Sequence, residues 1–409
     1  MTAALAKAHD KTRDESREDT RDAPSAPLVD VARPQATQAV DAALLRMVAE
    51  TKTSPLKLMR DFVGLSFGPG KISFKDYTQL RLFDETFWAG ADRKAVVGQF
   101  RGVEIHQRVN WEHEWWGLFD HKIAMASFLA AYGFPTIPVL ALYSDRLGTA
   151  AAHVARNAEE LRRVLTQESN YPMFGKPAEG LQSLGSVGLK RFSPQTQSLE
   201  TTDGRIVALD AFVAEILQHY ADGYVFQRFV TPHPAIRALC GDRLPTIRIV
   251  TLNIDGNPKV FRACWKIPAG ANVADNYWRA GNLLARIDVA KGEVVRVISG
   301  TGLGLAHHTA HPDTMVEMIG FRIPRWDEMV ATVTEAARLM RHVPLIGWDA
   351  AVLESGPMIV EMNERPDFLL LQLADARGVL DAELTDALTV QKRKEDERRK
   401  FNKGTLKKL

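Results

Sequence analysis

Cysteine is scarce in this chain. Its 409 residues include only Cys240 and Cys264. Two cysteines form at most one bridge, so the disulfide framework typical of small secreted proteins is excluded. The sequence also has no Cys-x-x-Cys pair that would indicate a zinc site. This cysteine usage is typical of a protein in a reducing compartment.

Long apolar runs are also missing. The amino terminus, MTAALAKAHDKTRDESREDTRD, is interrupted by charges where a signal peptide needs roughly 7 to 15 apolar residues. The longest apolar stretches, such as VPLIGWDAAVL, are shorter than the roughly 20 residues that a membrane-spanning helix requires. We therefore expect a cytoplasmic protein without a transmembrane segment.

Charge of one sign is not in excess, because 52 Lys and Arg face 50 Asp and Glu. The distribution is uneven: residues 390–409 hold nine Lys or Arg and three Asp or Glu, which leaves the remainder mildly acidic. A nucleic-acid-binding domain would carry its basic patch on the folded part, so no nucleic-acid partner is expected. The tail is favoured as a solvated helix over a contact for an acidic partner.

Strand-like and helical patterns are segregated along the chain. The runs PTIRIVTLNIDGNPKVFRACWKI, GNLLARIDVAKGEVVRVI and GWDAAVLESGPMIVEMN contain Gly turns and predict antiparallel hairpins. Helical periodicity marks DAALLRMVAE and WDEMVATVTEAARLMRHV. A further helix carrying Lys122 is predicted between an N-cap at Asp120 and the stop signals Gly133 and Pro135. This segregation indicates an α+β fold.

Several common site motifs are absent. There is neither a G-x-x-x-x-G-K-[ST] loop nor a G-x-G-x-x-G at a strand-to-helix junction, and His113-Glu114 is not followed by the second histidine of H-E-x-x-H. His307, His308 and His311 lie near a proline in a Gly-rich loop. Loop polarity or substrate contact is favoured there over metal binding.

Two lysines and a glycine-rich segment indicate a phosphate site. Lys122 on its predicted helix is followed by Lys176, which ends a strand before Gly180, Gly185 and Gly188. Glycines let a backbone approach a polyphosphate closely, and a lysine ammonium suits phosphate oxygens. Taken alone, an ordinary surface loop after a strand has the same appearance.

The hairpin GWDAAVLESGPMIVEMN carries a candidate metal site. Glu361 and Asn363 are two apart on a strand and share a face. An odd-numbered loop over Glu354–Pro357 would place Asp349 opposite one of them. Two carboxylates and an amide oxygen are ligands that Mg²⁺ accepts alongside substrate phosphates. A solvated hairpin face is the alternative, but the flanking residues of MIVEMN are apolar.

The order of these segments, together with YVFQRFV, DNYWRAGN, HPDT and IPRW, resembles the ATP-grasp superfamily, in particular its sugar-transfer-associated branch related to alpha-L-glutamate ligases. The resemblance extends from about Phe62 to Gln372. It implies ATP and Mg²⁺ or Mn²⁺ between two α+β subdomains, with Asp349, Glu361 and Asn363 as the metal ligands.

The resemblance also implies roles for individual residues. Lys122 and Lys176 would contact the phosphates under a lid over residues 180–188, and the linker Gln227-Arg228-Phe229-Val230 would bind adenine. Lys176 and Arg248 would act on the reacting groups. The segment DNYWRAGN departs from the usual asparagine followed by two glycines, which leaves the roles of Asn276 and Arg279 open.

From the resemblance and the composition of the two ends, we expect the chain to be divided into five segments. We expect a disordered charged arm over residues 1–40, a mixed helical segment over 41–119, ATP-grasp subdomains over 120–225 and 226–380, and a basic tail over 381–409, with both tails disordered.

The expected activity is an ATP-dependent carboxylate–amine ligase that forms an acyl phosphate. Its substrates would be small or sugar-linked carboxylates and amines, in surface-polysaccharide or sugar-transfer metabolism. A small-molecule kinase and a non-catalytic nucleotide-binding regulator remain alternatives. His233, Trp278 and His307 or His308 are candidate acceptor contacts.

Overall fold

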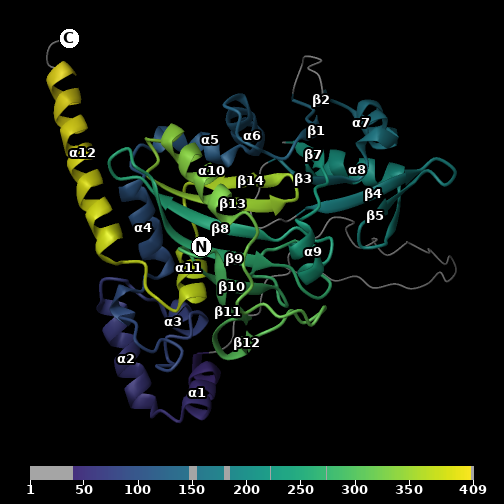
Figure 1. Ribbon diagram of the computed structural model, residues 1–409. Helices are drawn as coiled ribbons and strands as arrows, with labels where there is room; N and C mark the ends of the chain where they lie inside the picture. The colour runs from purple at the N-terminus through teal and green to yellow at the C-terminus, as the bar shows by residue number, and fades with distance from the viewer. Residues whose placement is uncertain (1–39, 147–153, 179–184, 222, 273, 407–409) are drawn as a thin grey trace, which may run out of the picture.

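The computed structural model describes residues 40–146, 154–178, 185–221, 223–272 and 274–406 (Figure 1). The charged arm predicted over residues 1–40 lies outside them except for its last residue, and so does Gly180. Within the described residues, the strands form two seven-stranded sheets, each with helices packed on it. No described helix is both long and apolar enough to span a membrane.

Short helices precede the first sheet. Ser54 and Ser73 begin two of them, because each side chain accepts a hydrogen bond from a backbone N–H in the first turn. Buried residues of these helices pack against the second sheet and the helices that follow it. The helices are α1 (Val40–Thr51), α2 (Pro55–Phe67), α3 (Phe74–Gln79), α4 (Gln99–Val109), α5 (Trp116–Asp120) and α6 (Lys122–Ala131).

The first sheet has the strand order β2-β1-β7-β3-β4-β5-β6. Its strands are β1 (Val139–Tyr143), β2 (Val154–Ala155), β3 (Met173–Pro177), β4 (Val187–Ser193), β5 (Ser198–Thr201), β6 (Ile206–Ala208) and β7 (Tyr224–Arg228). The apolar faces of α7 (Ala158–Thr166) and α8 (Leu209–His219) share one core with these strands. The strand predicted to end at Pro177 is therefore present, and it lies in the interior of the sheet.

The second sheet has the order β12-β11-β10-β9-β8-β13-β14. Its strands are β8 (Thr246–Leu252), β9 (Lys259–Ile267), β10 (Leu283–Asp288), β11 (Glu293–Ser299), β12 (Ala306–His308), β13 (Leu345–Leu353) and β14 (Gly356–Asn363). All neighbouring pairs are antiparallel, as predicted for the hairpins. The helices connected with this sheet are α9 (Pro234–Cys240), α10 (Trp326–Leu339) and α11 (Phe368–Asp375).

The two faces of the second sheet pack against different layers. Ile247 and Ile249 of β8 share a core with α10, whereas Val250 and Leu252 share a core with α11 and the amino-terminal helices. Because side chains alternate along a strand, Arg248 faces the same side as Val250. The charged residues described below therefore lie on the face opposite α10.

Helix α6 begins one residue later than the sequence predicts. Asp120 ends α5, and His121 is the N-cap instead, with its Nδ1 accepting a hydrogen bond from the Ala124 N–H at 3.2 Å. Lys122 is the first residue of α6. The predicted stop is correct, because Gly133 follows the helix with a φ of +78°.

The β13–β14 hairpin reaches its register through a bulge. Leu353 pairs with Gly356, so the turn between the strands is the two residues 354–355 rather than an odd-numbered loop. A regular ladder from this turn would place Asp349 opposite Val360. The register shifts between Asp349 and Ala350, and Asp349 pairs with Glu361. The expected pairing is present, although its physical cause differs from the prediction.

The carboxy-terminal segment forms the 25-residue helix α12 (Ala382–Leu406). Its first turns bury Leu384 and Ala387, and the Trp111 indole donates a hydrogen bond to Gln391. Its carboxy-terminal end projects from the body (Figure 1). The basic tail is therefore helical, as the solvated-helix interpretation predicts, and its first half is packed rather than disordered.

Asn110, which follows α4, provides a test of how the amino-terminal helices are joined to the second sheet. Its side chain is fully buried, donates to the carbonyls of Leu345 and Glu364 at 2.8 and 2.6 Å, and accepts from the Leu345 N–H at 2.9 Å. Asn110→Ala leaves these three backbone groups without a partner. We expect the free energy of unfolding to fall by about 2 to 4 kcal/mol in urea titration. The exposed Gln107→Ala on α4 is the control, and an equal effect of both variants would contradict this role.

Candidate functional site

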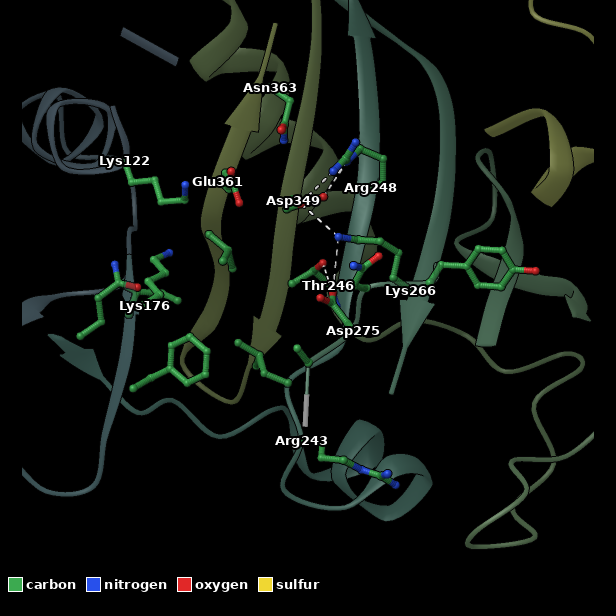
Figure 2. A pocket seen from close by; sticks show the side chains of 18 of the residues that line it. Lys122, Lys176, Arg243, Thr246, Arg248, Lys266, Asp275, Asp349, Glu361 and Asn363 are labelled. Carbon is green, nitrogen blue, oxygen red and sulfur yellow. Dashed lines mark hydrogen bonds and ion pairs between the residues drawn. The ribbon is translucent and has the colours of Figure 1, made fainter. Parts of the chain in front are cut away.

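A cavity of about 380 Å³ lies between the two sheets (Figure 2). One wall comes from β3, β7 and the residues after β7, and the opposite wall comes from β8, β9, β13 and β14. The rest of the lining comes from Lys122 of α6, from Leu370 of α11 and from loop residues, namely Ile137, Arg243, Leu244, residues 274–278, Arg365 and Asp367. The cavity therefore joins segments that are far apart in sequence.

Charged side chains from adjacent strands meet on one face of the second sheet. Arg248 of β8 pairs with Asp349 of β13, which pairs with Glu361 of β14. Directly paired residues project to the same side, and Lys266 of β9 reaches the same group (Figure 2). Four neighbouring strands thus contribute one row of charges to the cavity.

Asp349 is the centre of this row. Its carboxylate accepts two hydrogen bonds from the Arg248 guanidinium, at 2.6 and 2.9 Å, and a third from Lys266 Nζ at 3.1 Å. All three residues are buried. Burial raises the pKa of the Asp349 carboxyl, but the charges and hydrogen bonds of Arg248 and Lys266 outweigh that effect and hold the pKa well below its ordinary value. Asp349 is therefore ionised at neutral pH.

Lys266 and Asp275 were not identified from the sequence. Lys266 Nζ lies 3.5 Å from Asp275 Oδ2, and the same oxygen accepts hydrogen bonds from both the backbone N–H and the hydroxyl of Thr246. A signal was available for Lys266, because it interrupts the apolar run of FRACWKI at an alternating position. Asp275 lies in a loop, where no periodicity applies.

Lys122 and Lys176 lie on the other side of the cavity. Both line it, and the side chain of Lys122 extends toward Glu361 (Figure 2). Burial and the charge of Lys122 lower the pKa of the Lys176 ammonium, and the carboxylates of Glu361 and Asp349 only partly oppose this. The two lysines therefore face the carboxylates across a space that a bound group can occupy.

One end of the cavity is lined by apolar side chains and by the backbone of the linker after β7. Gln227, Arg228, Phe229 and Val230 all line it, as do Ile137 and Phe174. The Phe229 N–H donates to the Pro172 carbonyl at 3.1 Å, which fixes the linker after β7. This end suits a flat heteroaromatic ring with polar edges.

The predicted glycine lid is only partly described. Gly185 and Gly188 are not among the cavity-lining residues. A Cβ atom at Gly185 would lie 2.7 Å from the Tyr220 hydroxyl, and one at Gly188 would lie 2.3 Å from the Thr202 hydroxyl. Close packing therefore accounts for both glycines, and their assignment to the nucleotide stays a prediction.

The charge of the lining favours an anion. Seven Lys or Arg side chains line the cavity, against four Asp or Glu side chains. The positive groups lie on both walls, so they can surround a ligand. An elongated, negatively charged molecule with an aromatic end matches this arrangement. The lining cations are Lys122, Lys176, Arg228, Arg243, Arg248, Lys266 and Arg365.

Asp349, Glu361 and Asn363 suit a divalent cation that binds oxygen. Asp349 uses three hydrogen bonds of the roughly four that a carboxylate accepts, which leaves a lone pair for a metal. Among the described residues, the buried Nδ2 of Asn363 has no hydrogen-bond partner, so the amide can turn its oxygen inward without losing a bond. No group of three or more His, Cys, Asp or Glu that could hold a metal occurs in the described chain. A site there would need the amide as its third ligand.

The two residues whose roles were left open and the candidate acceptor contacts differ in whether they line the cavity. Asn276 and Trp278 line the cavity, whereas Arg279, His233, His307 and His308 do not. His233 is the N-cap of α9, and His308 forms a 2.7 Å hydrogen bond with Ser299. A structural role therefore accounts for both of these histidines.

His311 is fully buried. Its Nε2 lies 3.1 Å from the Pro268 carbonyl oxygen, and its Nδ1 accepts from the Asp313 N–H at 3.2 Å. Both ring nitrogens therefore bond to the backbone, which agrees with the preference for loop polarity over metal binding.

Solved structures similar to this chain include ligases at low identity. The D-alanine–D-alanine ligase from Coxiella burnetii is 12% identical, with a TM-score of 0.40, over 70% of this chain and 62% of that one. The corresponding ligase from Bacillus anthracis is 14% identical, with a TM-score of 0.37, over 69% and 70%. The L-amino acid ligase from Bacillus licheniformis is 14% identical, with a TM-score of 0.34, over 66% and 48%. The chain thus spans less than two thirds of the first and the last of these proteins.

Among curated proteins no significant match is found. A family model, described as sugar-transfer associated ATP-grasp, matches residues 136–387. This range is more than half of the chain and includes both sheets and the lysine, arginine and carboxylate residues of the cavity other than Lys122. The two sheets around the cavity are accordingly an ATP-grasp fold, and the chain belongs to the sugar-transfer associated ATP-grasp family.

Proposed function

We propose that this protein is an ATP-dependent carboxylate–amine ligase that works through an acyl phosphate. The observation that carries the proposal is the arrangement of Lys122 and Lys176 opposite the row formed by Glu361, Asp349 and Arg248. Cations on both walls suit a triphosphate, and a carboxylate pair beside them suits the metal that accompanies it.

The cavity offers separate regions for the two ends of ATP. Adenine would lie against Phe229 and Val230, where Gln227 and the backbone of the linker supply polar edges. The phosphates would then extend between Lys176 and Arg248. A bound phosphate restores a favourable environment for the charged form of Lys176, which burial disfavours in the free protein.

Asp349, Glu361 and Asn363 would hold Mg²⁺ or Mn²⁺. The ion, when bound, neutralises charge on phosphate oxygens. Arg248 and Lys266 fix the Asp349 carboxylate in one orientation before any ligand arrives, because three hydrogen bonds hold it. This preorganisation lowers the cost of assembling the site.

The chemistry needs no nucleophilic side chain from the protein. A substrate carboxylate oxygen attacks the γ-phosphorus of ATP, the bond to the β-γ bridging oxygen breaks, and ADP leaves. An amine then attacks the acyl carbon and displaces inorganic phosphate, which forms the amide. Lys122, Lys176 and Arg248 bind the transferring phosphoryl oxygens, and enclosure of the cavity protects the acyl phosphate from water. The family description connects the substrates with sugar transfer, so we propose a sugar-linked or similarly polar carboxylate or amine.

Hydroxylamine trapping tests the proposed reaction. The protein is incubated with ATP, Mg²⁺, hydroxylamine and a panel of carboxylates, and both ADP and hydroxamate are measured. A ligase gives both products with the correct carboxylate, because only an activated acyl group reacts with hydroxylamine. ADP with a stable phosphorylated product and no hydroxamate would identify a kinase. Tight ATP binding with no turnover across the panel would favour the regulator.

Lys176 gives a prediction that separates binding from stability. Lys176→Met removes a phosphate contact, and we expect ATP affinity in calorimetry to fall about tenfold or more. Because the pKa of Lys176 is lowered, the partly buried charge costs some folding free energy at neutral pH. The free variant should therefore melt at the parent temperature or slightly above it. Lys190→Met, at an exposed position of β4, is the control, and unchanged ATP affinity in Lys176→Met would remove this lysine from the site.

Glu361 gives the cleanest test of the metal site. Glu361→Gln keeps the shape of the side chain but removes one negative charge, so we expect the Mg²⁺ concentration for half-maximal ATP turnover to rise about tenfold. Mn²⁺ should restore part of the activity. Glu354→Gln, in the exposed turn of the same hairpin, is the matched control. Parent turnover by Glu361→Gln at limiting Mg²⁺ would exclude the hairpin as the metal site.

Asp349 is expected to behave differently from Glu361. Asp349→Asn leaves the buried charges of Arg248 and Lys266 without their shared counterion. Such a loss typically lowers the free energy of unfolding by about 3 to 5 kcal/mol. Urea titration should therefore show a large loss for Asp349→Asn and a small one for Glu361→Gln. Equal stability of the two variants would contradict the central role of Asp349.

A further inference from the structure

Helix α2 is apolar on the side that faces away from the protein. Leu58 and Leu65 are buried, as expected for the inner face of a surface helix. On the opposite side, Leu56 and Phe67 are 80% and 81% exposed, and Val63 is 45% exposed. Their spacing of seven and four residues places them on one outer stripe, about 16 Å long at the rise of an α-helix. A helix that is apolar on two opposite faces normally has a partner on each.

The same corner of the molecule adds further apolar surface. Phe100, at the start of α4, is 75% exposed. The Gly98 N–H donates to the Gly70 carbonyl at 2.8 Å, and this contact joins the start of α4 to the loop that follows α2. Large exposed side chains on adjacent segments indicate an interaction surface rather than isolated exposed residues.

Cations border the apolar stripe. Lys52, Arg60, Lys71 and Lys94 are exposed, and in the described part of the chain none of them forms an ion pair. The nearby carboxylates of Glu50, Asp61 and Glu85 are engaged by Arg81, Arg93 and Lys57. Among the described residues, the exposed Asp92 beside Arg60 and Lys94 is also not ion-paired, so the unpaired charge around the stripe is mainly positive, with one carboxylate among the cations.

We propose that the outer face of α2 docks this protein onto an anionic lipid bilayer. The apolar stripe of Leu56, Val63 and Phe67 would enter the boundary between headgroups and acyl chains, and the bordering cations would contact lipid phosphates. The combination of bulky apolar groups with lysines favours a lipid surface, since the cores of protein interfaces are depleted of lysine. The inference does not depend on the proposed ligase reaction.

The position of α2 is compatible with this role. Helices α1 and α2 form one end of the molecule, away from β3, β13 and β14, which line the cavity (Figure 1). A surface bound at α2 leaves the cavity accessible. Docking would hold the cavity near a membrane, with α2 lying on the membrane surface.

Vesicle flotation tests the proposal with the full-length chain. The parent is mixed with vesicles of phosphatidylcholine alone or of phosphatidylcholine and phosphatidylglycerol in equal amounts. We expect flotation with the anionic vesicles and a lower bound fraction at high salt. The double variant Leu56→Ser/Phe67→Ser should reduce the bound fraction about tenfold. Lys52→Gln/Arg60→Gln should weaken binding to the anionic vesicles and reduce its salt dependence.

Three controls make the result decisive. Ile206→Ser/Met315→Ser removes exposed apolar groups elsewhere and should float like the parent. A chain that ends at Arg399 removes the basic end of α12, and loss of flotation in this chain alone would overturn the proposal. Failure of the parent to float, or parent-like flotation of Leu56→Ser/Phe67→Ser, would also overturn it.

Light scattering tests whether a second copy of the chain covers the face instead. A dimer that Leu56→Ser/Phe67→Ser dissociates, without vesicle binding, would assign the face to a second copy and overturn the proposal. Unchanged circular dichroism and ATP affinity show that the variants are folded.

Discussion

The buried ion cluster of Arg248, Asp349 and Lys266 is the constraint on which the site depends. Three strands must be in register for these side chains to meet, because each lies on a different strand of the second sheet. Removing Asp349 leaves the buried guanidinium of Arg248 without its carboxylate partner, which is far more costly than losing a surface ion pair. The cluster therefore connects strand pairing with the orientation of the carboxylate that faces the cavity. The same three side chains therefore stabilise the second sheet and fix the geometry of the site.

The bulge near Val360 resolves a conflict between packing and chemistry. Ile359 and Met362 both belong to the core shared with α10, although they are three residues apart on one strand. A regular strand would direct one of them to the opposite face. The extra residue lets both enter the core while Glu361 and Asn363 face the cavity. An irregularity in the ladder thus allows one strand to serve the hydrophobic core and the polar site.

Sequence reasoning identified the parts of the site that local patterns encode. Lys176 before its proline, the Glu361 and Asn363 pair, and the segregation of helices and hairpins all follow from periodicity and turn residues. The N-cap at His121 and the bulge were missed, because a competing helix and core packing decide them. Lys266 was missed although its alternation was visible, and Asp275 had no local signal. The site is therefore predictable where one strand encodes it and unpredictable where tertiary contacts choose the partner.

The hydrogen bonds of Asn110 limit how far the chain can be shortened from its amino terminus and still fold. The family match begins at residue 136, yet Asn110 satisfies backbone groups of Leu345 and Glu364 within the matched region. Val97 likewise exchanges two backbone hydrogen bonds with the buried side chain of Gln372. A fragment that starts at the matched boundary would expose the α11 side of the second sheet and leave these groups unpaired. The part of the chain that folds on its own is therefore larger than the region matched by the family model. Expression of residues 136–387 alone should yield aggregated protein.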